Sequence, residues 1–152
     1  PVDFIAELLA AGVIEYAQLH GSEDAAYIEA LRKRTALLGK TAKIIKTVKV
    51  GSTADLENIS EIDCEYLLLD AWSKEGEAAG GNGRTFEWSL IKALEKPFFL
   101  AGGLTVDNVQ QAVRMTSPYG IDASSCMETE DCKDLNKMKA FAQAVRVNET
   151  NN

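Results

Sequence analysis

The chain has 152 residues, 46% of them hydrophobic and 26% charged, a composition typical of one globular domain. Its net charge of −7 argues against nucleic acid or an anionic membrane surface as a partner, because both require clustered Lys and Arg. No apolar stretch approaches the roughly 18 residues of a membrane span, and no secretory signal pattern is visible. Three cysteines without a C-x-x-C pair and a single histidine, His20, favour free thiols in a reducing cytoplasm over a disulfide or a metal site.

Apolar stretches of strand length alternate with helical patterns from one end of the chain to the other. Continuous apolar or β-branched stretches indicate strands, and apolar residues three or four positions apart indicate helices. Glycine after a stretch, and Ser, Thr or Asp before one, mark the boundaries. The expected elements, in chain order, are a helix at 2–11, a strand at 13–20, a helix at 22–31, a strand at 43–50, a short helix at 52–59, a strand at 66–70, a helix at 88–94, a strand at 97–101, a helix at 105–115, a strand at 121–124 and a helix at 133–145.

This order predicts an α/β fold in which five strands are each followed by a helix. Strict alternation with continuous apolar strands indicates a parallel sheet that helices cover. Two architectures fit, an open doubly wound sheet and part of a (β/α)8 barrel. The length favours the open sheet, because such barrels typically have about 250 residues. The polar strand ends favour the barrel, and the lack of a G-x-G-x-x-G motif argues against a dinucleotide-binding sheet.

Small and polar residues at two strand ends predict a phosphate site. Gly102 and Gly103 follow one strand and precede a helix, where backbone N–H groups can approach an anion closely. The next strand ends in Asp122, Ala123, Ser124 and Ser125, which adds hydroxyl donors. The loops after the last two strands are the usual phosphate site of a (β/α)8 barrel. The alternative is two ordinary turns that use the glycines and serines for their geometry.

Two other strand ends carry side chains that can take part in chemistry. Asp70 closes the apolar stretch L-L-L-D, so its carboxylate is either a partnered structural group or part of a site. The Gly-rich stretch 80–85 follows it and is long enough to close over a ligand. Gln18 and His20 share one face of the first strand, as expected for the polar mouth of a barrel. A hydrogen-bonded structural role is the alternative for His20.

Five motifs in register carry a resemblance to a known family. They are A-Q-L-H-G at 17–21, L-L-L-D at 67–70, G-G-N-G-R-T-F-E-W at 80–88, L-A-G-G-L-T-V-D-N-V at 100–109 and I-D-A-S-S at 121–125. In this order and spacing they resemble phosphoribosylanthranilate isomerase, an enzyme of tryptophan biosynthesis with a (β/α)8 TIM-barrel fold. The resemblance covers essentially all of residues 2–146. It implies that residues 1–147 hold about five of the eight βα units, followed by a polar tail at 148–152.

The resemblance also implies an activity and the roles of several residues. The reaction would be the Amadori rearrangement of N-(5-phosphoribosyl)anthranilate to 1-(2-carboxyphenylamino)-1-deoxyribulose 5-phosphate, a phosphorylated small-molecule substrate, with no cofactor. Asp70 would be the general acid. Gly102, Gly103, Ser124 and Ser125 would hold the phosphate, with Gln18, His20 and Asp122 at the same site.

The sequence departs from the family pattern in two places. Cys126 and Cys132 stand where the family usually has glycine, and a side chain at the first position is expected to crowd the phosphate loop. Nothing matches the first three strands of the family or the K-x-C-G segment that carries its general base. We therefore expect a chain that lacks the N-terminal part of the barrel and self-associates through open sheet edges. The alternatives are an inactive half-barrel and another phosphate-binding barrel such as indole-glycerol-phosphate synthase, for which Lys46 and Lys49 would be the candidate lysines.

Overall fold

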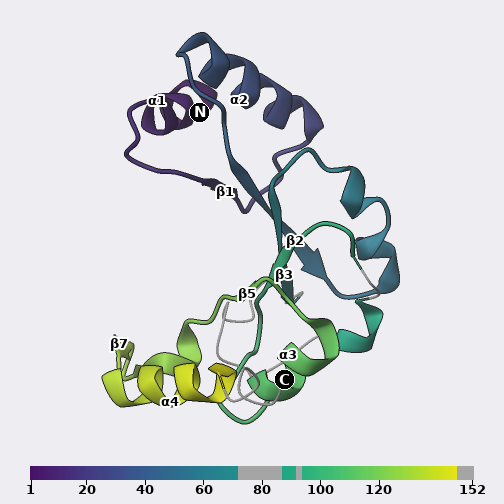
Figure 1. Cartoon of the computed structure of the whole chain (residues 1–152), viewed down its shortest axis with the longest axis vertical. Coiled ribbons are helices and arrows are strands. Elements are labelled where there is room, and N and C mark those ends of the chain that lie inside the picture. Colours follow the sequence, from purple (N-terminus) through teal and green to yellow (C-terminus); the bar gives the residue numbers. More distant parts are fainter. Residues whose placement is uncertain (72–86, 92–93, 147–152) are drawn as a thin grey trace.

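The computed structural model describes residues 1–71, 87–91 and 94–146 and contains one five-stranded parallel sheet (Figure 1). Its strands follow the order β1-β2-β3-β4-β5, so each strand pairs with the next one along the chain. A doubly wound sheet reverses its strand order at a switch point, whereas the strands of a barrel do not. The order therefore decides between the two expected architectures in favour of the barrel. The strands are β1 Ala17–Leu19, β2 Ile44–Val50, β3 Tyr66–Ala71, β4 Phe98–Leu100 and β5 Gly120–Ile121.

The elements form an open arc with the sheet at its centre (Figure 1). Helices α1 and α2 lie at one end of the arc and α3 and α4 at the other, and β1 and β5 are the two edges of the sheet. Within the described residues no helix is long and apolar enough to cross a membrane. The helices are α1 Val2–Ala10, α2 Ala25–Leu37, α3 Val109–Thr116 and α4 Leu135–Arg146, with 3-10 turns η1 Thr53–Leu56, η2 Ile59–Glu61, η3 Trp88–Leu90 and η4 Ser125–Met127 and a hairpin of β6 Glu128–Thr129 and β7 Cys132–Lys133.

The core lies between the helices and the outer face of the sheet. Alternate residues of the central strands point outward and are completely buried, among them Ile44, Leu67, Leu69 and Leu100. Each side chain of this size contributes roughly 1.5–3 kcal/mol when it is fully buried. On the concave face, Ile45, Tyr66 and Phe99 are partly exposed whereas Thr47 and Leu68 are buried, so this face is only partly accessible.

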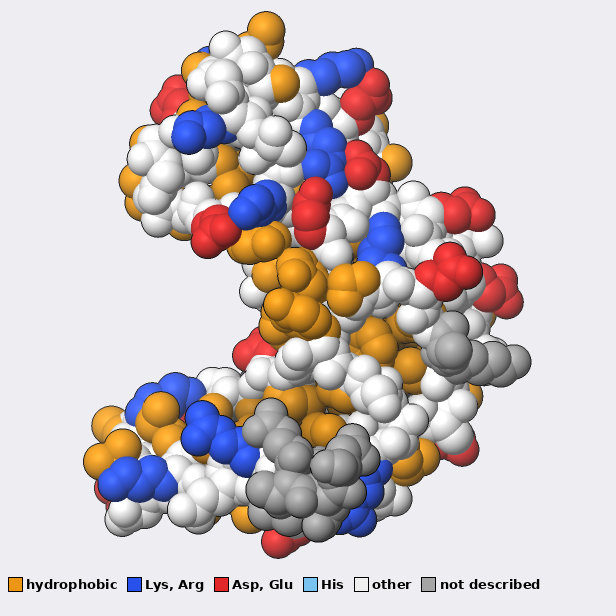
Figure 2. All heavy atoms as spheres, viewed as in Figure 1, with side chains coloured by type: hydrophobic (Ala, Val, Ile, Leu, Met, Phe, Trp, Pro, Cys, Tyr) orange, Lys and Arg blue, Asp and Glu red, His pale blue; other side chains and the backbone are white. Residues whose placement is uncertain are grey.

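Aromatic rings occupy the amino-terminal end of the concave face. Hydrophobic side chains gather on the hollow side of the arc (Figure 2). Tyr66 contacts Tyr16, Phe99 and Tyr119, with ring centroids 4.8–5.7 Å apart. Gly120 makes room for one of these rings, because a Cβ atom there would lie 2.7 Å from Cε1 of Phe99. The aromatic layer closes the end of the concave face that is opposite the carboxyl ends of the strands.

The first strand is shorter than the expected 13–20, because the preceding residues cap α1. Gly12 adopts φ +70, and the amide of Val13 donates to the carbonyl of Leu8 at 3.0 Å, a Schellman-type ending. The amides that were expected in the strand therefore close the helix. In α1, Ala6 and Leu9 are buried, while Phe4 is 59% exposed. Apolar spacing predicts the helix, whereas packing against the neighbouring elements determines which of its faces is buried.

The helix expected at 52–59 is instead two 3-10 turns. Asp55 accepts hydrogen bonds from the amides of Gly51 and Ser52 at 3.0 and 2.8 Å and from the Ser52 hydroxyl, and these bonds hold the pKa of its carboxyl below the usual value. Asn58 then adopts the left-handed conformation with φ 57, which stops any continuation. The helix expected at 88–94 is likewise described only as the turn Trp88–Leu90.

Two further helix boundaries and one hairpin differ from the expectation. Helix α2 continues past Leu31 to Leu37, and Arg32 within it donates to the carbonyl of Ala42 at 2.7 Å. Helix α4 begins after Asp134, whose carboxylate accepts the amides of Asn136 and Lys137. The hairpin β6–β7 was not expected at all. Its turn places two residues without the usual Gly or Asn signature, Glu130 and Asp131, at positive φ.

Candidate active site at the carboxyl ends of the strands

The residues singled out in the sequence lie along the carboxyl-terminal edge of the sheet. Asp70 is in β3, Gly102 and Gly103 follow β4, and Asp122 follows β5. The ladder extends past the assigned strands, since Ala101 donates to the carbonyl of Leu69 at 2.8 Å and Asp122 to that of Leu100 at 2.9 Å. The carboxyl ends of parallel strands lie at one edge of the sheet, so Asp70 and the turns after β4 and β5 lie along the same edge.

Asp70 faces the concave side and is paired with a lysine. Lys49 stands opposite it in the register of β2 and β3, and its ammonium contacts the carboxylate directly. The Asp70 side chain is 20% exposed and that of Lys49 40%, so the pair lies at the surface of the edge rather than inside the core. A ligand on the concave face can therefore reach both charges.

The turn after β4 is pressed against the Asp70 side chain. Gly102 and Gly103 have φ values of +83 and +65, in the left-handed region that favours glycine. A Cβ atom on Gly102 would lie 2.7 Å from Oδ1 of Asp70 and 2.6 Å from Cβ of Ala71. This close approach means that glycine at 102 has a steric reason as well as a conformational one. Asp70 and the turn that was expected to hold phosphate therefore lie against each other.

The helix after this turn begins later than expected. The sequence predicted a helix capped by Thr105, whereas α3 starts at Val109. The amide of Thr105 donates to Oδ1 of Asn108 at 2.8 Å, and Nδ2 of Asn108 donates to the carbonyl of Gly103 at 3.0 Å. Asn108 thus folds the intervening residues into a loop. An anion at Gly102–Gly103 would meet loop amides rather than the first turn of the helix.

Ser124 lies beside a charged pair from the β6–β7 hairpin, and Ser125 follows it as the first residue of η4. Nζ of Lys133 donates to Oγ of Ser124 at 2.7 Å, and the Ser124 hydroxyl also lies 3.2 Å from Oε1 of Glu128. Lys133 and Glu128 are themselves 2.5 Å apart. The Lys133 ammonium and the Ser124 hydroxyl together hold the pKa of the Glu128 carboxyl below its usual value. The hydroxyl of Ser124 is thus placed between a cation and an anion.

Gln18 and His20 lie on the same edge but away from Asp70. Gln18 is exposed between the buried Ala17 and Leu19, as alternation predicted, and His20 is exposed just past β1. β2 separates β1 from the strand of Asp70. No hydrogen bond or ion pair described for residues 1–71 joins Gln18 or His20 to Asp70. The stretch 80–85, expected to close over a ligand, falls outside the described residues.

The three cysteines are free thiols, and two of them are turned towards the core. Cys64 is buried, and Cys126 packs against the core from η4. Burial raises the pKa of both thiols, so neither is suited to act as a thiolate. The effect of Cys126 on the phosphate loop stays a prediction. Among the described residues no group of three or more His, Cys, Asp or Glu side chains is arranged to hold a metal ion.

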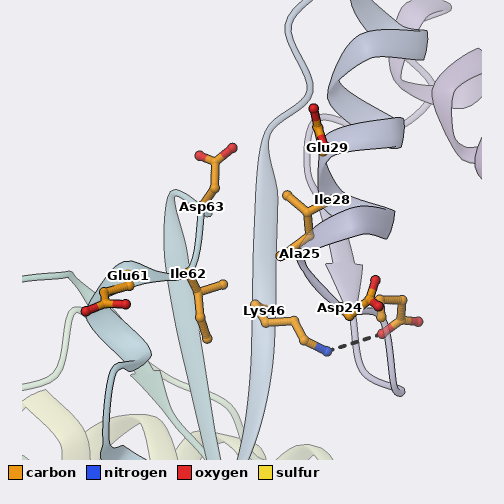
Figure 3. A pocket seen from close by; sticks show the side chains of 9 residues that line it. Asp24, Ala25, Ile28, Glu29, Lys46, Glu61, Ile62 and Asp63 are labelled. Atoms are coloured by element: carbon orange, nitrogen blue, oxygen red, sulfur yellow. Dashed lines mark hydrogen bonds and ion pairs between the residues drawn. The ribbon is translucent and has the colours of Figure 1, made fainter.

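A cavity of about 300 Å³ lies on the other face of the sheet, between the start of α2, β2 and η2 (Figure 3). Lys46 points into it and donates to the carbonyl of Gly21 at 2.8 Å and to Glu23 at 3.3 Å. Five carboxylate side chains line the same cavity and would repel a phosphorylated ligand. They are Glu23, Asp24, Glu29, Glu61 and Asp63. This cavity is therefore not a second candidate for the phosphate.

Sequence reasoning missed the charged partners of this edge. Lys49 was considered only as a lysine for the competing synthase reaction, although strand alternation puts it on the same face as Asp70. Glu128 and Lys133 were missed because the hairpin that carries them was not expected. Lys46, the other lysine of that alternative, is held by backbone carbonyls on the outer face and is unavailable to a ligand at the carboxyl edge.

Comparison with known proteins identifies the family. The family model for N-(5'-phosphoribosyl)anthranilate (PRA) isomerase matches residues 1–144. The N-(5'-phosphoribosyl)anthranilate isomerase of Caldanaerobacter subterraneus subsp. tengcongensis is 33% identical over 148 residues, which are 96% of this chain and 68% of the relative. The chain thus spans about two thirds of the length of this relative.

Solved structures agree with the sequence comparison. Phosphoribosyl anthranilate isomerase from Thermotoga maritima superposes with a TM-score of 0.76 at 27% identity, covering 95% of this chain and 68% of that one. A phosphoribosyl anthranilate isomerase in complex with reduced 1-(o-carboxyphenylamino)-1-deoxyribulose 5-phosphate gives 0.69 at 26% identity, covering 95% and 66%. The expected (β/α)8-barrel family is thereby confirmed. The chain belongs to the N-(5'-phosphoribosyl)anthranilate isomerase family.

Proposed function

We propose that the carboxyl edge of this sheet carries out the isomerisation of phosphoribosylanthranilate in tryptophan biosynthesis, with Asp70 as the general acid. The observation that carries the assignment is the contact between Gly102 and the Asp70 carboxylate. This contact supports the proposal because it puts the Asp70 carboxyl group beside a glycine turn whose backbone could receive an anion. A substrate whose phosphate sits at the turn would then hold its ribose ring over Asp70.

The chemistry requires one proton to be given and one to be taken. Asp70 protonates the ribose ring oxygen while the bond from that oxygen to C1 breaks, and the nitrogen lone pair forms a C1=N double bond. Removal of the proton from C2 moves its electron pair into a C1–C2 double bond and returns the C1=N electrons to nitrogen. The resulting enol becomes the ketone at C2 as C1 gains a proton and the C2 hydroxyl loses one. The Schiff base itself accepts the electrons, which is why no cofactor is required.

The base that removes the C2 proton is not one of the described cysteines. No cysteine of the chain stands in a K-x-C-G segment. Cys64 and Cys126 are turned towards the core, and Cys132 is exposed on the β6–β7 hairpin. If these residues turn the substrate over on their own, we propose His20 as the base, because its imidazole is exposed on the same edge.

The phosphate is proposed to lie between Gly102–Gly103 and Ser124–Ser125, held mainly by backbone amides and hydroxyls. The chain is acidic overall, so attraction must come from local donors rather than from a general positive field. Free cysteines and a soluble phosphorylated substrate support the cytoplasm as the location.

Inorganic phosphate should slow amide hydrogen exchange in the two turns at 102–105 and 124–127. The expected protection arises because amides that donate to a bound anion are withdrawn from water. Sodium chloride at matched ionic strength serves as the control for non-specific screening. Protection confined to the acidic cavity around residues 23–29, or equal protection by chloride, would contradict the proposed phosphate site.

A further inference from the structure

We infer that Lys133 and Glu128 set the anion affinity of the Ser124 turn in opposite directions, the lysine raising it and the glutamate lowering it. The inference rests on the proposed phosphate site and extends it to two residues of the β6–β7 hairpin. A charge pair beside an anion site is usually assigned a purely structural role. Here the two members contact the same hydroxyl that is proposed to meet the phosphate, so each charge acts on the ligand as well as on its partner.

The contacts place both charges at the turn itself. Nζ of Lys133 lies 2.7 Å from Oγ and 3.3 Å from the carbonyl of Ser124. Oε1 of Glu128 lies 3.2 Å from the same Oγ and 2.5 Å from Nζ of Lys133. The Ser124 hydroxyl accepts a hydrogen bond from Lys133 and donates one to Glu128. A phosphate that accepts a hydrogen bond from this hydroxyl must therefore displace Glu128 as the acceptor.

The hairpin holds these groups in place through other contacts. The ammonium of Lys137 donates to the backbone carbonyl of Glu128 at 2.6 Å. The hydroxyl of Thr129 donates to Asp134 at 2.9 Å, and the amide of Asp134 donates to the carbonyl of Met127 at 2.8 Å. None of these bonds uses the carboxylate of Glu128 or the ammonium of Lys133. Changing either charge therefore leaves the backbone of the turn anchored.

Electrostatics predicts the direction and the size of each effect. With both residues present, their charges nearly cancel at a nearby phosphate. Removing the ammonium leaves the Glu128 carboxylate to repel the anion, and removing the carboxylate leaves the ammonium to attract it. Side-chain exposures of 51% and 28% mean substantial screening by water. At an effective dielectric constant near that of water, a change of one charge should alter the dissociation constant roughly three- to tenfold.

The direction in which each variant changes phosphate affinity distinguishes this role from a structural one. Dissociation constants for inorganic phosphate would be measured from the amide chemical shifts of Gly102, Gly103, Ser124 and Ser125. We expect Lys133→Met to weaken binding roughly three- to tenfold, Glu128→Gln to strengthen it by a similar factor, and the double variant to return near the parent. Lys133→Arg should keep the parental affinity. All these shifts should shrink when sodium chloride is raised from 50 mM to 0.5 M.

Matched controls and contrary outcomes are available within the chain. Lys43 and Glu15 form another lysine–glutamate pair, 2.8 Å apart and remote from the turn, so Lys43→Met and Glu15→Gln should leave phosphate affinity unchanged. Weakening by both Lys133→Met and Glu128→Gln would show a purely structural tie and overturn the inference alone. A parent protein in which phosphate shifts none of the four amides would overturn the proposed phosphate site and the inference with it.

Discussion

In a complete barrel, replacing Asp70 with Asn should lower kcat for phosphoribosylanthranilate by ~10²–10⁴-fold, the usual contribution of general acid–base catalysis. The amide has nearly the same shape as the carboxyl group but has no acidic proton to give to the ring oxygen. Asp70→Asn also removes a negative charge that lies against the Gly102 turn, so the dissociation constant of inorganic phosphate should stay the same or fall while kcat drops. The measurement is steady-state turnover together with phosphate titration of the same two proteins.

A matched substitution controls for the loss of a carboxylate as such. Asp63 also pairs with a basic side chain, lying 2.6 Å from Arg32, but it is far from the carboxyl edge. Asp63→Asn should therefore leave kcat within a factor of about two of the parent. Turnover by the Asp70→Asn protein within a few-fold of the parent would show that Asp70 is a structural partner of Lys49 and not the acid.

Replacing Gly102 with Ala should lower the free energy of unfolding by roughly 2–5 kcal/mol and displace the Asp70 carboxylate. Two costs add at this position. The backbone at φ +83 is strained for any residue with a side chain, and the new methyl group would overlap Ala71 and Oδ1 of Asp70. Urea unfolding measures the stability, and turnover measures the displaced acid. We expect both to fall together in this single variant.

Two other glycines separate the conformational cost from the steric one. Gly12 and Gly39 have φ values of +70 and +79, yet a Cβ atom on either would meet no heavy atom within 4 Å. Gly12→Ala and Gly39→Ala should therefore lose only about 1–2 kcal/mol, the cost of the left-handed backbone. A loss at Gly102 no larger than at these two positions would mean that the turn does not press against Asp70 as described.

The sequence predicts the strands better than their ends, for physical reasons that particular residues illustrate. The continuous apolar stretch of β3 could be read directly, because a strand buried against helices needs few polar side chains. The predicted first strand is too long, because the helix-capping motif at Gly12 uses the amides of the residues that follow it. The helix expected at 52–59 failed because Asp55 bonds to the backbone before it, a local competition that periodicity does not register.

The sequence predicts those parts of the candidate site that depend on a single residue type. It does not predict the parts that depend on contacts between distant residues. Glycine at 102 and the aspartate that ends L-L-L-D can each be read at a strand end. The ion pair of Lys49 with Asp70 depends on strand register, and the bonds of Lys133 depend on a hairpin whose turn residues, Glu130 and Asp131, give no conventional signal. Self-association through the edge strands β1 and β5 stays a prediction.

The central claim is that one ligand spans the carboxyl edge from the Gly102 turn to Asp70. A crystal structure of this protein with reduced 1-(o-carboxyphenylamino)-1-deoxyribulose 5-phosphate, the compound bound in the related solved structure, tests it most directly. We expect the phosphate between Gly102–Gly103 and Ser124–Ser125, with the sugar chain within hydrogen-bond distance of the Asp70 carboxylate. A phosphate bound on the outer face, or a ligand whose sugar lies beyond reach of Asp70, would contradict the account.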